Sequence, residues 1–229
     1  MAPVSYTHLL NETTALVQVT DYVTHVLFWS NNLYLHDRLH QNWTSLRKSY
    51  QGVVSASTGH IATHESGAVE ACGHKVLTLP SHNGKIDAAE LSRFLVDYDQ
   101  DANHDHIVMP GMVYISHPTE YGTLYSHSEL EEISRICRQH HIPLYLDGAR
   151  LAYALACPQN DLSLQDLAAL CDVFYIGGTK CGALFGEAVV ITVSGLIPHF
   201  FTIIKPVSYT HLCILHTTDL QSIFRMVPY

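Results

Sequence analysis

The chain contains 229 residues, of which 47% are hydrophobic, a proportion that is typical of a globular protein with a sizeable core. Its 12 basic and 21 acidic side chains give a formal net charge of -9 and include no long run of Lys or Arg, so we expect no nucleic-acid partner. The longest apolar stretch, residues 188–204, is interrupted by Gly195, Pro198 and His199, so we expect no membrane span. Six cysteines without a CxxC pair, and an N-terminus unlike a signal peptide, favour reduced thiols and a cytoplasmic location.

The two ends of the chain differ in composition from its middle. All 13 glycines lie between Gly52 and Gly195, and the heptamer PVSYTHL occurs identically at residues 3–9 and 206–212. Structural repeats diverge in sequence and have periods of roughly 20 to 50 residues, which these two distant, identical copies do not match. We therefore interpret the heptamers as linker or adapter sequence left by library assembly, and the native segment as a fragment with foreign or misframed termini. Chance recurrence and a duplicated tag are the alternatives.

In chain order, the middle of the sequence alternates between short apolar runs and helical patterns. The runs are rich in branched and aromatic residues, as buried strands are, and they predict strands at residues 53–57, 74–79, 112–117, 143–148, 173–178 and 188–192. Helices are predicted between them, from Asp87 to Tyr98, from Ser126 to His140 and from Ser163 to Leu170. This order predicts an α/β fold with a mostly parallel sheet covered by helices on both faces.

The segment from Ser126 to His140 carries the clearest helix signals. Ser126 and Glu129 have the spacing of a capping box, in which each side chain accepts a hydrogen bond from the other residue's backbone N–H. One face of this helix is apolar and consists of Leu130, Ile133, Ile136 and Cys137. On the opposite face we expect Glu131 to pair with Arg135, four residues later.

Chemically reactive side chains occur just after most of the predicted strands. His60 follows the first strand, Glu120 lies in the HPTEYG turn after the third, Asp147 and Arg150 accompany the end of the fourth, and Lys180 follows the fifth. In open α/β sheets, ligands bind beyond the carboxyl ends of the strands. We therefore expect these side chains to line one ligand site.

Together these residue types suit a pyridine ring that bears an aldehyde and a phosphate. Asp147 could keep the ring nitrogen protonated, and Lys180, on a glycine turn, could form a Schiff base with the aldehyde. Thr179 could bind the phosphate, and Arg150 could bind a substrate carboxylate through two hydrogen bonds. His60 could lie flat on the ring and transfer protons.

The motifs LDGAR, GGTKCGA, TGHIATHESGAVEACGHKV and HPTEYGTLYS, with their order and spacing, resemble the threonine aldolase and aromatic amino acid beta-eliminating lyase family. The resemblance covers residue 51 to about residue 205. Members of this family are pyridoxal-phosphate enzymes with the aspartate aminotransferase (type I) fold. The resemblance therefore implies pyridoxal 5'-phosphate as the cofactor, and a homodimer or homotetramer as the assembly of the intact protein.

The resemblance also implies a role for each motif residue. Asp147 would contact the pyridine nitrogen, Lys180 would carry the Schiff base, and Thr179 would be the neighbouring hydroxyl residue. Arg150 would contact the substrate carboxylate or the cofactor, and His60 would stack on the cofactor ring.

The sequence departs from the family pattern in three places. The family has a glycine-rich phosphate loop where residues 27–51 contain no glycine. Some members carry a histidine proposed as a base in the turn where this chain has Glu120, which makes Glu120 a candidate catalytic residue here. Residues 196–205 resemble the start of the helix that leads to a small domain, which would supply another substrate-binding arginine, but the repeated heptamer begins directly afterwards at residue 206.

These features divide the chain into three expected parts. Residues 1–50 form an atypical N-terminal segment that we interpret as non-native, and residues 51–195 form the cofactor-binding large domain. Residues 196–229 comprise a truncated start of the small domain and a non-native tail.

We expect a lyase that acts on a small β-hydroxy amino acid, with threonine yielding glycine and an aldehyde. A beta-eliminating C-S lyase or an aminotransferase would use the same residues, and an inactive fragment that retains cofactor weakly is a further alternative. No metal site is expected, because the HDH motif at 104–106 and the HH pair at 140–141 lack a third ligand at a suitable spacing.

Overall fold

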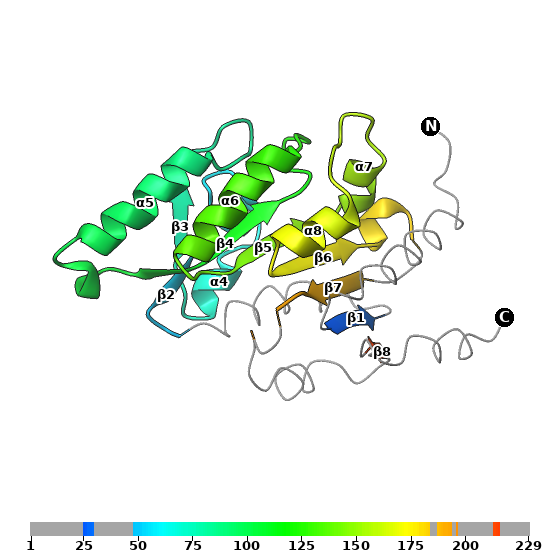
Figure 1. Cartoon of the computed structure of the whole chain (residues 1–229). Helices are drawn as coiled ribbons and strands as arrows, with labels where there is room; N and C mark the ends of the chain where they lie inside the picture. The colour runs from blue at the N-terminus through cyan, green and yellow to red at the C-terminus, as the bar shows by residue number, and fades with distance from the viewer. Residues whose placement is uncertain (1–24, 30–47, 184–186, 194–195, 197–212, 216–229) are drawn as a thin grey trace.

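The computed structural model describes residues 25–29, 48–183, 187–193, 196 and 213–215. These residues form one eight-stranded sheet with the order β3-β2-β4-β5-β6-β7-β1-β8 (Figure 1). The strands are β1 (His25–Trp29), β2 (Gln51–Ala56), β3 (Val76–Leu79), β4 (Met109–Ser116), β5 (Leu144–Gly148), β6 (Val173–Gly177), β7 (Glu187–Ile191) and β8 (Cys213–Leu215). All six predicted strands are present, and the α/β class is confirmed.

The sheet is parallel on one side and antiparallel on the other. Strands β3, β2, β4, β5 and β6 are parallel to one another, as predicted. Strand β7 pairs antiparallel with β6, and β1 and β8 continue the sheet in antiparallel pairs. The carboxyl ends of β2, β4, β5 and β6 therefore lie along one edge of the sheet, where a ligand site is expected.

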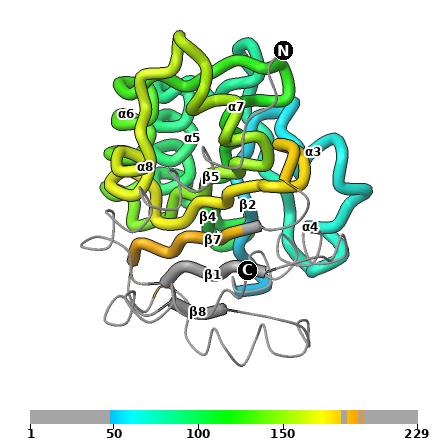
Figure 2. Tube along the Cα trace, turned by 90° about the vertical axis from the view of Figure 1, so that its right-hand side faces the viewer, coloured from blue at the N-terminus to red at the C-terminus, as the bar shows by residue number. Residues whose placement is uncertain are grey.

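Helices cover both faces of the sheet. The helices are α3 (His60–Thr63), α4 (Ala68–Ala71), α5 (Ala88–Gln100), α6 (His127–Gln139), α7 (Leu151–Leu155) and α8 (Leu164–Leu170), with short 3-10 turns η1 (His104–His106) and η2 (Thr179–Cys181). Figure 2 shows α5, α6 and α8 on one side of the sheet and α3 and α4 on the other. The second face thus carries only single-turn helices in the part of the chain that the structure describes.

Each face of the sheet has its own apolar core, because side chains alternate between the faces along a strand. Val113 and Ile115 of β4 pack with Leu130 of α6 in the core beneath the long helices. Tyr114 of the same strand belongs to the opposite core, together with Ile61 of α3. Because both faces of the sheet are packed, the residues at the ends of each strand have fixed positions at the edge of the sheet.

Helix α6 begins and packs as its sequence predicts. The Ser126 hydroxyl accepts the backbone N–H of Glu129, and the Glu129 carboxylate accepts the backbone N–H of Ser126. Leu130, Ile133, Ile136 and Cys137 are all buried. The expected pairing of Arg135 with Glu131 is wrong, because Arg135 donates instead to both carboxylate oxygens of Glu132 at 2.6 and 2.9 Å. The planar guanidinium group reaches both oxygens at the three-residue spacing, which makes this contact bidentate.

Two sequence-based expectations concern segments near the termini. The heptamers at 3–9 and 206–212 lie outside the described residues, and the division of the chain at residues 50 and 195 stays a prediction. Among the described helices, none combines the length and apolar character needed to cross a bilayer.

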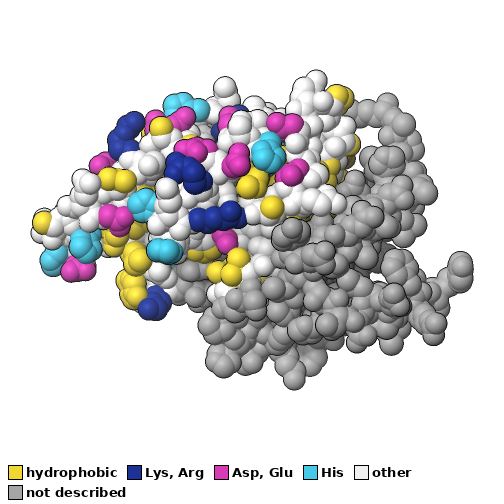
Figure 3. All heavy atoms as spheres, in the orientation of Figure 1, with side chains coloured by type: hydrophobic (Ala, Val, Ile, Leu, Met, Phe, Trp, Pro, Cys, Tyr) yellow, Lys and Arg dark blue, Asp and Glu magenta, His cyan; other side chains and the backbone are white. Residues whose placement is uncertain are grey.

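Acidic and basic side chains are interspersed over the face formed by α5, α6 and α8 (Figure 3).

Candidate active site

A polar pocket lies at the carboxyl ends of the central strands. Its lining residues are His60, Ser116, Pro118, Glu120, Asp147, Ala149, Arg150 and Lys180. Five of the six predicted site residues are among them, and they come from α3, the turn after β4, the end of β5, and η2 after β6. The sixth, Thr179, precedes Lys180 in η2 and is not among the residues that line the pocket.

Asp147 is the most deeply buried charged residue of the pocket, with 3% of its surface exposed. Its Oδ1 accepts the backbone N–H of Ala149 at 2.8 Å, and its Oδ2 accepts the hydroxyl hydrogen of Tyr114. Burial, together with the nearby Asp147 carboxylate, raises the pKa of Tyr114 well above its usual value, so the phenol keeps its proton and acts as the donor. These two hydrogen bonds offset part of the cost of burying the carboxylate.

Two glycines bring the Lys180 turn beside Asp147. A Cβ atom at Gly148 would lie 2.1 Å from the carbonyl oxygen of Tyr175, and one at Gly177 would lie 2.4 Å from the carbonyl oxygen of Ala149. The backbones of the DGAR turn and of β6 are therefore in direct contact, which any larger residue would prevent. This contact explains why the DGAR turn has glycine directly after Asp147 and why β6 ends in glycine three residues before Lys180.

His60 is the first residue of α3 and is partly exposed. Its Nε2 lies 3.1 Å from Glu65 Oε1, and its ring stacks on that of His64 with the centroids 5.4 Å apart. The hydrogen bond to Glu65 raises the pKa of His60, burial opposes this shift, and the negative charges of Glu65 and Asp147 add to it. His60 is thus adapted to hold a proton at the mouth of the pocket.

Glu120 presents one free carboxylate oxygen in the pocket. The Ser116 hydroxyl donates to Glu120 Oε1 at 2.7 Å. Glu120 Oε2 is buried and has no hydrogen-bond partner among the residues that the structure describes. A buried acceptor without a partner is rare in proteins, and it is expected where a ligand supplies the missing donor.

His117 connects this pocket to the helical side of the protein. Its backbone N–H donates to the Asp147 carbonyl at 2.8 Å, and its Nδ1 accepts the backbone N–H of Tyr125 at 3.3 Å. Burial lowers the pKa of His117 to about 4, so the ring is neutral at neutral pH. His117 is therefore a structural residue that supports the turn carrying Glu120.

Sequence reasoning missed two residues that contact the predicted ones. Ser116 is the last residue of β4, so the rule that ligands bind at strand ends could have identified it. Tyr114 lies inside a buried strand, where an aromatic residue is ordinary. Its contact with Asp147 depends on how β4 and β5 align, which no local pattern reports.

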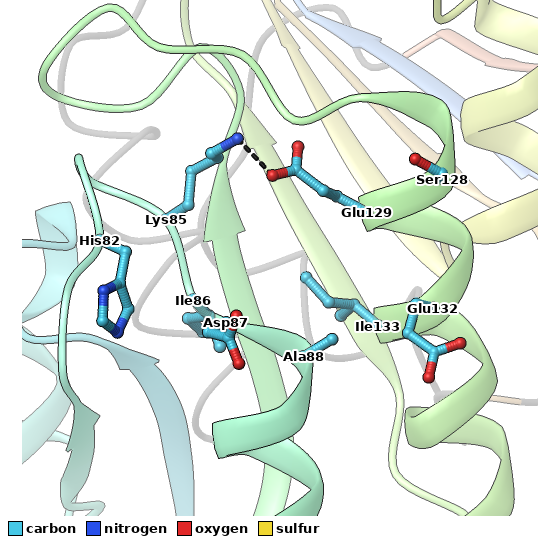
Figure 4. A pocket seen from close by; sticks show the side chains of 9 residues that line it. All are labelled: His82, Lys85, Ile86, Asp87, Ala88, Ser128, Glu129, Glu132 and Ile133. Atoms are coloured by element: carbon cyan, nitrogen blue, oxygen red, sulfur yellow. Dashed lines mark hydrogen bonds and ion pairs between the residues drawn. The ribbon is translucent and has the colours of Figure 1, made fainter.

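A second pocket lies where α5 and α6 begin (Figure 4). Across it, Lys85 and Glu129 point toward one another and form an ion pair of 2.5 Å. The carboxylate of Asp87 accepts the backbone N–H groups of Ala89 and Glu90 at the start of α5. Because these polar groups already stabilise helix ends, we assign this pocket a structural role.

The chain is similar to several known proteins. A profile of the Beta-eliminating lyase family matches residues 13–200. A low specificity L-threonine aldolase from Pseudomonas sp. (strain NCIMB 10558) is 36% identical over 151 residues, which are 64% of this chain and 42% of that protein. A threonine aldolase structure from Leishmania major has 40% identity and a TM-score of 0.73, over 85% of this chain and 56% of that one. A C-S lyase from Staphylococcus hominis with bound pyridoxal phosphate has 12% identity and a TM-score of 0.57, over 88% of this chain and 50% of that one.

The fold and the pocket define an α/β protein whose polar site combines an amine, an imidazole, a guanidinium and two carboxylates at the carboxyl ends of parallel strands. Because the family profile covers most of its length, the chain belongs to the beta-eliminating lyase family, and its fold is that of the threonine aldolases. It spans 42% of the length of the Pseudomonas relative and 56% of the Leishmania structure.

The contact with Glu65 predicts how His60 titrates. Replacing Glu65 with Gln keeps a hydrogen-bonding group but removes the negative charge, so the pKa of His60 should fall. The imidazole NMR signals of His60 in a pH titration measure this shift. Glu70→Gln, which changes a neighbouring exposed carboxylate, serves as the control, and a His60 pKa that is unchanged in Glu65→Gln would contradict the assignment.

Burial of His117 predicts a loss of stability in acid. The pKa of His117 is about 4 when folded and 6.5 in the unfolded chain, so only the unfolded state takes up this proton between those values. The stabilisation is complete above pH 6.5 and falls by roughly 3 kcal/mol as the pH decreases to 4. Urea unfolding at several pH values should show a shallower dependence in His117→Gln than in the wild type. The exposed His106→Gln should behave like the wild type, and identical pH profiles for all three chains would refute the prediction.

Proposed function

We propose that this chain binds pyridoxal 5'-phosphate and belongs to a lyase that cleaves a small β-hydroxy amino acid, with threonine yielding glycine and acetaldehyde. The observation that carries the proposal is the meeting of Lys180, Asp147, His60, Glu120 and Arg150 in one pocket. The threonine aldolases named above, at 36% and 40% identity, support the choice of reaction.

The residues present fit this cofactor. Asp147 is a buried carboxylate suited to a protonated ring nitrogen, and Lys180 is an amine that lines the same pocket. The buried Glu120 Oε2, which has no donor among the described residues, suits a hydroxyl group of a bound ligand. Bound pyridoxal phosphate would supply an aldehyde for the amino group and a ring that withdraws electrons from the substrate.

The surrounding residues would position the cofactor and the substrate. Asp147 would hold the ring nitrogen in its protonated form, and Lys180 would bind the aldehyde carbon. Thr179, as the neighbouring hydroxyl residue, would bind the phosphate. Arg150 would bind the substrate carboxylate with two N–H groups, which orients the bond that breaks.

Glu120 and His60 would handle the protons. Glu120 Oε2 would accept the β-hydroxyl proton as the bond between Cα and Cβ breaks, while Ser116 holds the other carboxylate oxygen. The electron pair of that bond stays with Cα, the β-carbon leaves as an aldehyde, and Cα takes up a proton to give glycine. His60, whose pKa Glu65 raises, would hold a proton close to these groups. The cytoplasmic location and the homo-oligomeric assembly stay predictions.

The first test of the proposal is chemical trapping at Lys180. Borohydride reduction of the chain with one equivalent of pyridoxal phosphate should attach one reduced cofactor, with loss of water, to the peptide that contains Lys180. Lys180→Ala should lose this addition, whereas the exposed Lys75→Ala should retain it. Labelling that is spread over surface lysines, and that is the same in all three chains, would rule out the proposed role of Lys180.

The second test identifies the reaction from its products. With threonine and pyridoxal phosphate, the chain should release glycine and acetaldehyde in equal amounts, and Lys180→Ala should release neither. Pyruvate with ammonia from a sulfur-containing amino acid would instead indicate a beta-eliminating C-S lyase, and a keto acid would indicate an aminotransferase. Trapped cofactor without any turnover would show that the chain is an inactive fragment of its enzyme.

A further inference from the structure

We propose that Tyr114 is a positioning residue, which holds the Asp147 carboxylate ionised and in one orientation toward the cofactor. The inference rests on the proposed function, because the ligand of Asp147 is the pyridine ring. It concerns a residue of β4 that does not line the pocket and that acts through Asp147.

The alignment of two strands creates this contact. Strands β4 and β5 are parallel, with Ser116 beside Asp147 and Tyr114 beside Tyr145. The side chains of Tyr114, Tyr145 and Asp147 therefore share one face of the sheet, and the Tyr114 hydroxyl reaches Asp147 Oδ2. Both partners are buried, at 2% exposure for Tyr114 and 3% for Asp147.

The Tyr114 ring has little freedom to turn away. It stacks on Tyr145, with the ring centroids 5.5 Å apart and the planes within 9°. Both rings belong to the apolar core that includes Ile61 of α3. A phenol that is stacked on a neighbouring ring and buried in the core can hold the carboxylate in one orientation at low entropic cost.

The hydrogen bond also supports the charge of Asp147. A buried carboxylate tends to take up a proton unless donors stabilise the anion. The Tyr114 hydroxyl and the Ala149 backbone N–H are two such donors to Asp147. Removal of the Tyr114 hydroxyl would weaken the stabilisation of the Asp147 anion and favour its protonated form. A protonated Asp147 could no longer keep the ring nitrogen charged.

Several other ionisable groups face Asp147, and the test must distinguish Tyr114 from them. They are Tyr145 on the same strand, Tyr175 opposite Asp147 on β6, His60 on α3, Glu120 after β4, Arg150 in the DGAR turn and Lys180 in η2. Tyr114→Phe leaves all of them in place and removes one hydroxyl. The matched control is Tyr125→Phe, because Tyr125 is also buried and its hydroxyl accepts the backbone N–H of Ile86 on the other face of the sheet.

The experiment measures pyridoxal-phosphate affinity of the full chain at pH 8 and at pH 6. Tyr114→Phe should raise Kd about tenfold at pH 8, because a hydrogen bond to a charged group is lost, and should raise it further at pH 6 as Asp147 takes up a proton. Tyr125→Phe should reduce stability while Kd stays at the wild-type value. A Kd in Tyr114→Phe that matches the wild type at both pH values overturns the inference and leaves the proposed function intact.

A second measurement needs no cofactor and separates the two proposals. In urea unfolding of the apo chain, Tyr114→Phe should destabilise the wild type more than it destabilises Asp147→Asn, because a hydrogen bond to a carboxylate is stronger than one to an amide. Equal effects in both backgrounds would overturn the inference. If the wild-type chain binds no pyridoxal phosphate while this coupling is present, the proposed function fails and the pairing of Tyr114 with Asp147 stands.

Discussion

The arrangement of the candidate site depends on a carboxylate that is buried at the end of a central strand. Asp147 is almost fully enclosed, and an enclosed charge is costly unless donors and a fixed scaffold accompany it. Strand β5 supplies the scaffold, because hydrogen bonding to a parallel strand on each side, β4 and β6, fixes its position and register in the sheet. Tyr114 and the Ala149 N–H supply the donors. The other predicted site residues that line the pocket are arranged around this anion.

The parallel strands and the two glycines bring those side chains to it. Gly148 and Gly177 allow the DGAR turn and the end of β6 to touch through their backbones, so Lys180 reaches the same pocket from the next strand. His60 lies after β2, which is two strands away from β5, and Glu120 lies in the turn after β4, the strand between them. A binding site made from four chain segments thus depends on one edge of a rigid sheet.

Two histidines near this site have opposite properties for clear physical reasons. His117 is enclosed between the turn and the helical layer, and burial lowers its pKa to about 4. His60 contacts Glu65 and remains partly exposed, so its pKa is raised. The first is therefore a neutral supporting residue, while the second is suited to proton transfer. The same side chain favours different protonation states in the two places, because its surroundings differ.

The sequence by itself determined the strand and helix order, the capping box at Ser126 and the clustering of Asp147 and Lys180, because each depends on local periodicity or on the rule for parallel sheets. Only the tertiary structure decided which side chains meet across strands. The Tyr114 contact with Asp147, the Ser116 contact with Glu120 and the antiparallel pairing of β7 all follow from register and strand direction. Local sequence does not encode these directly, because they result from how the whole sheet packs against its helices.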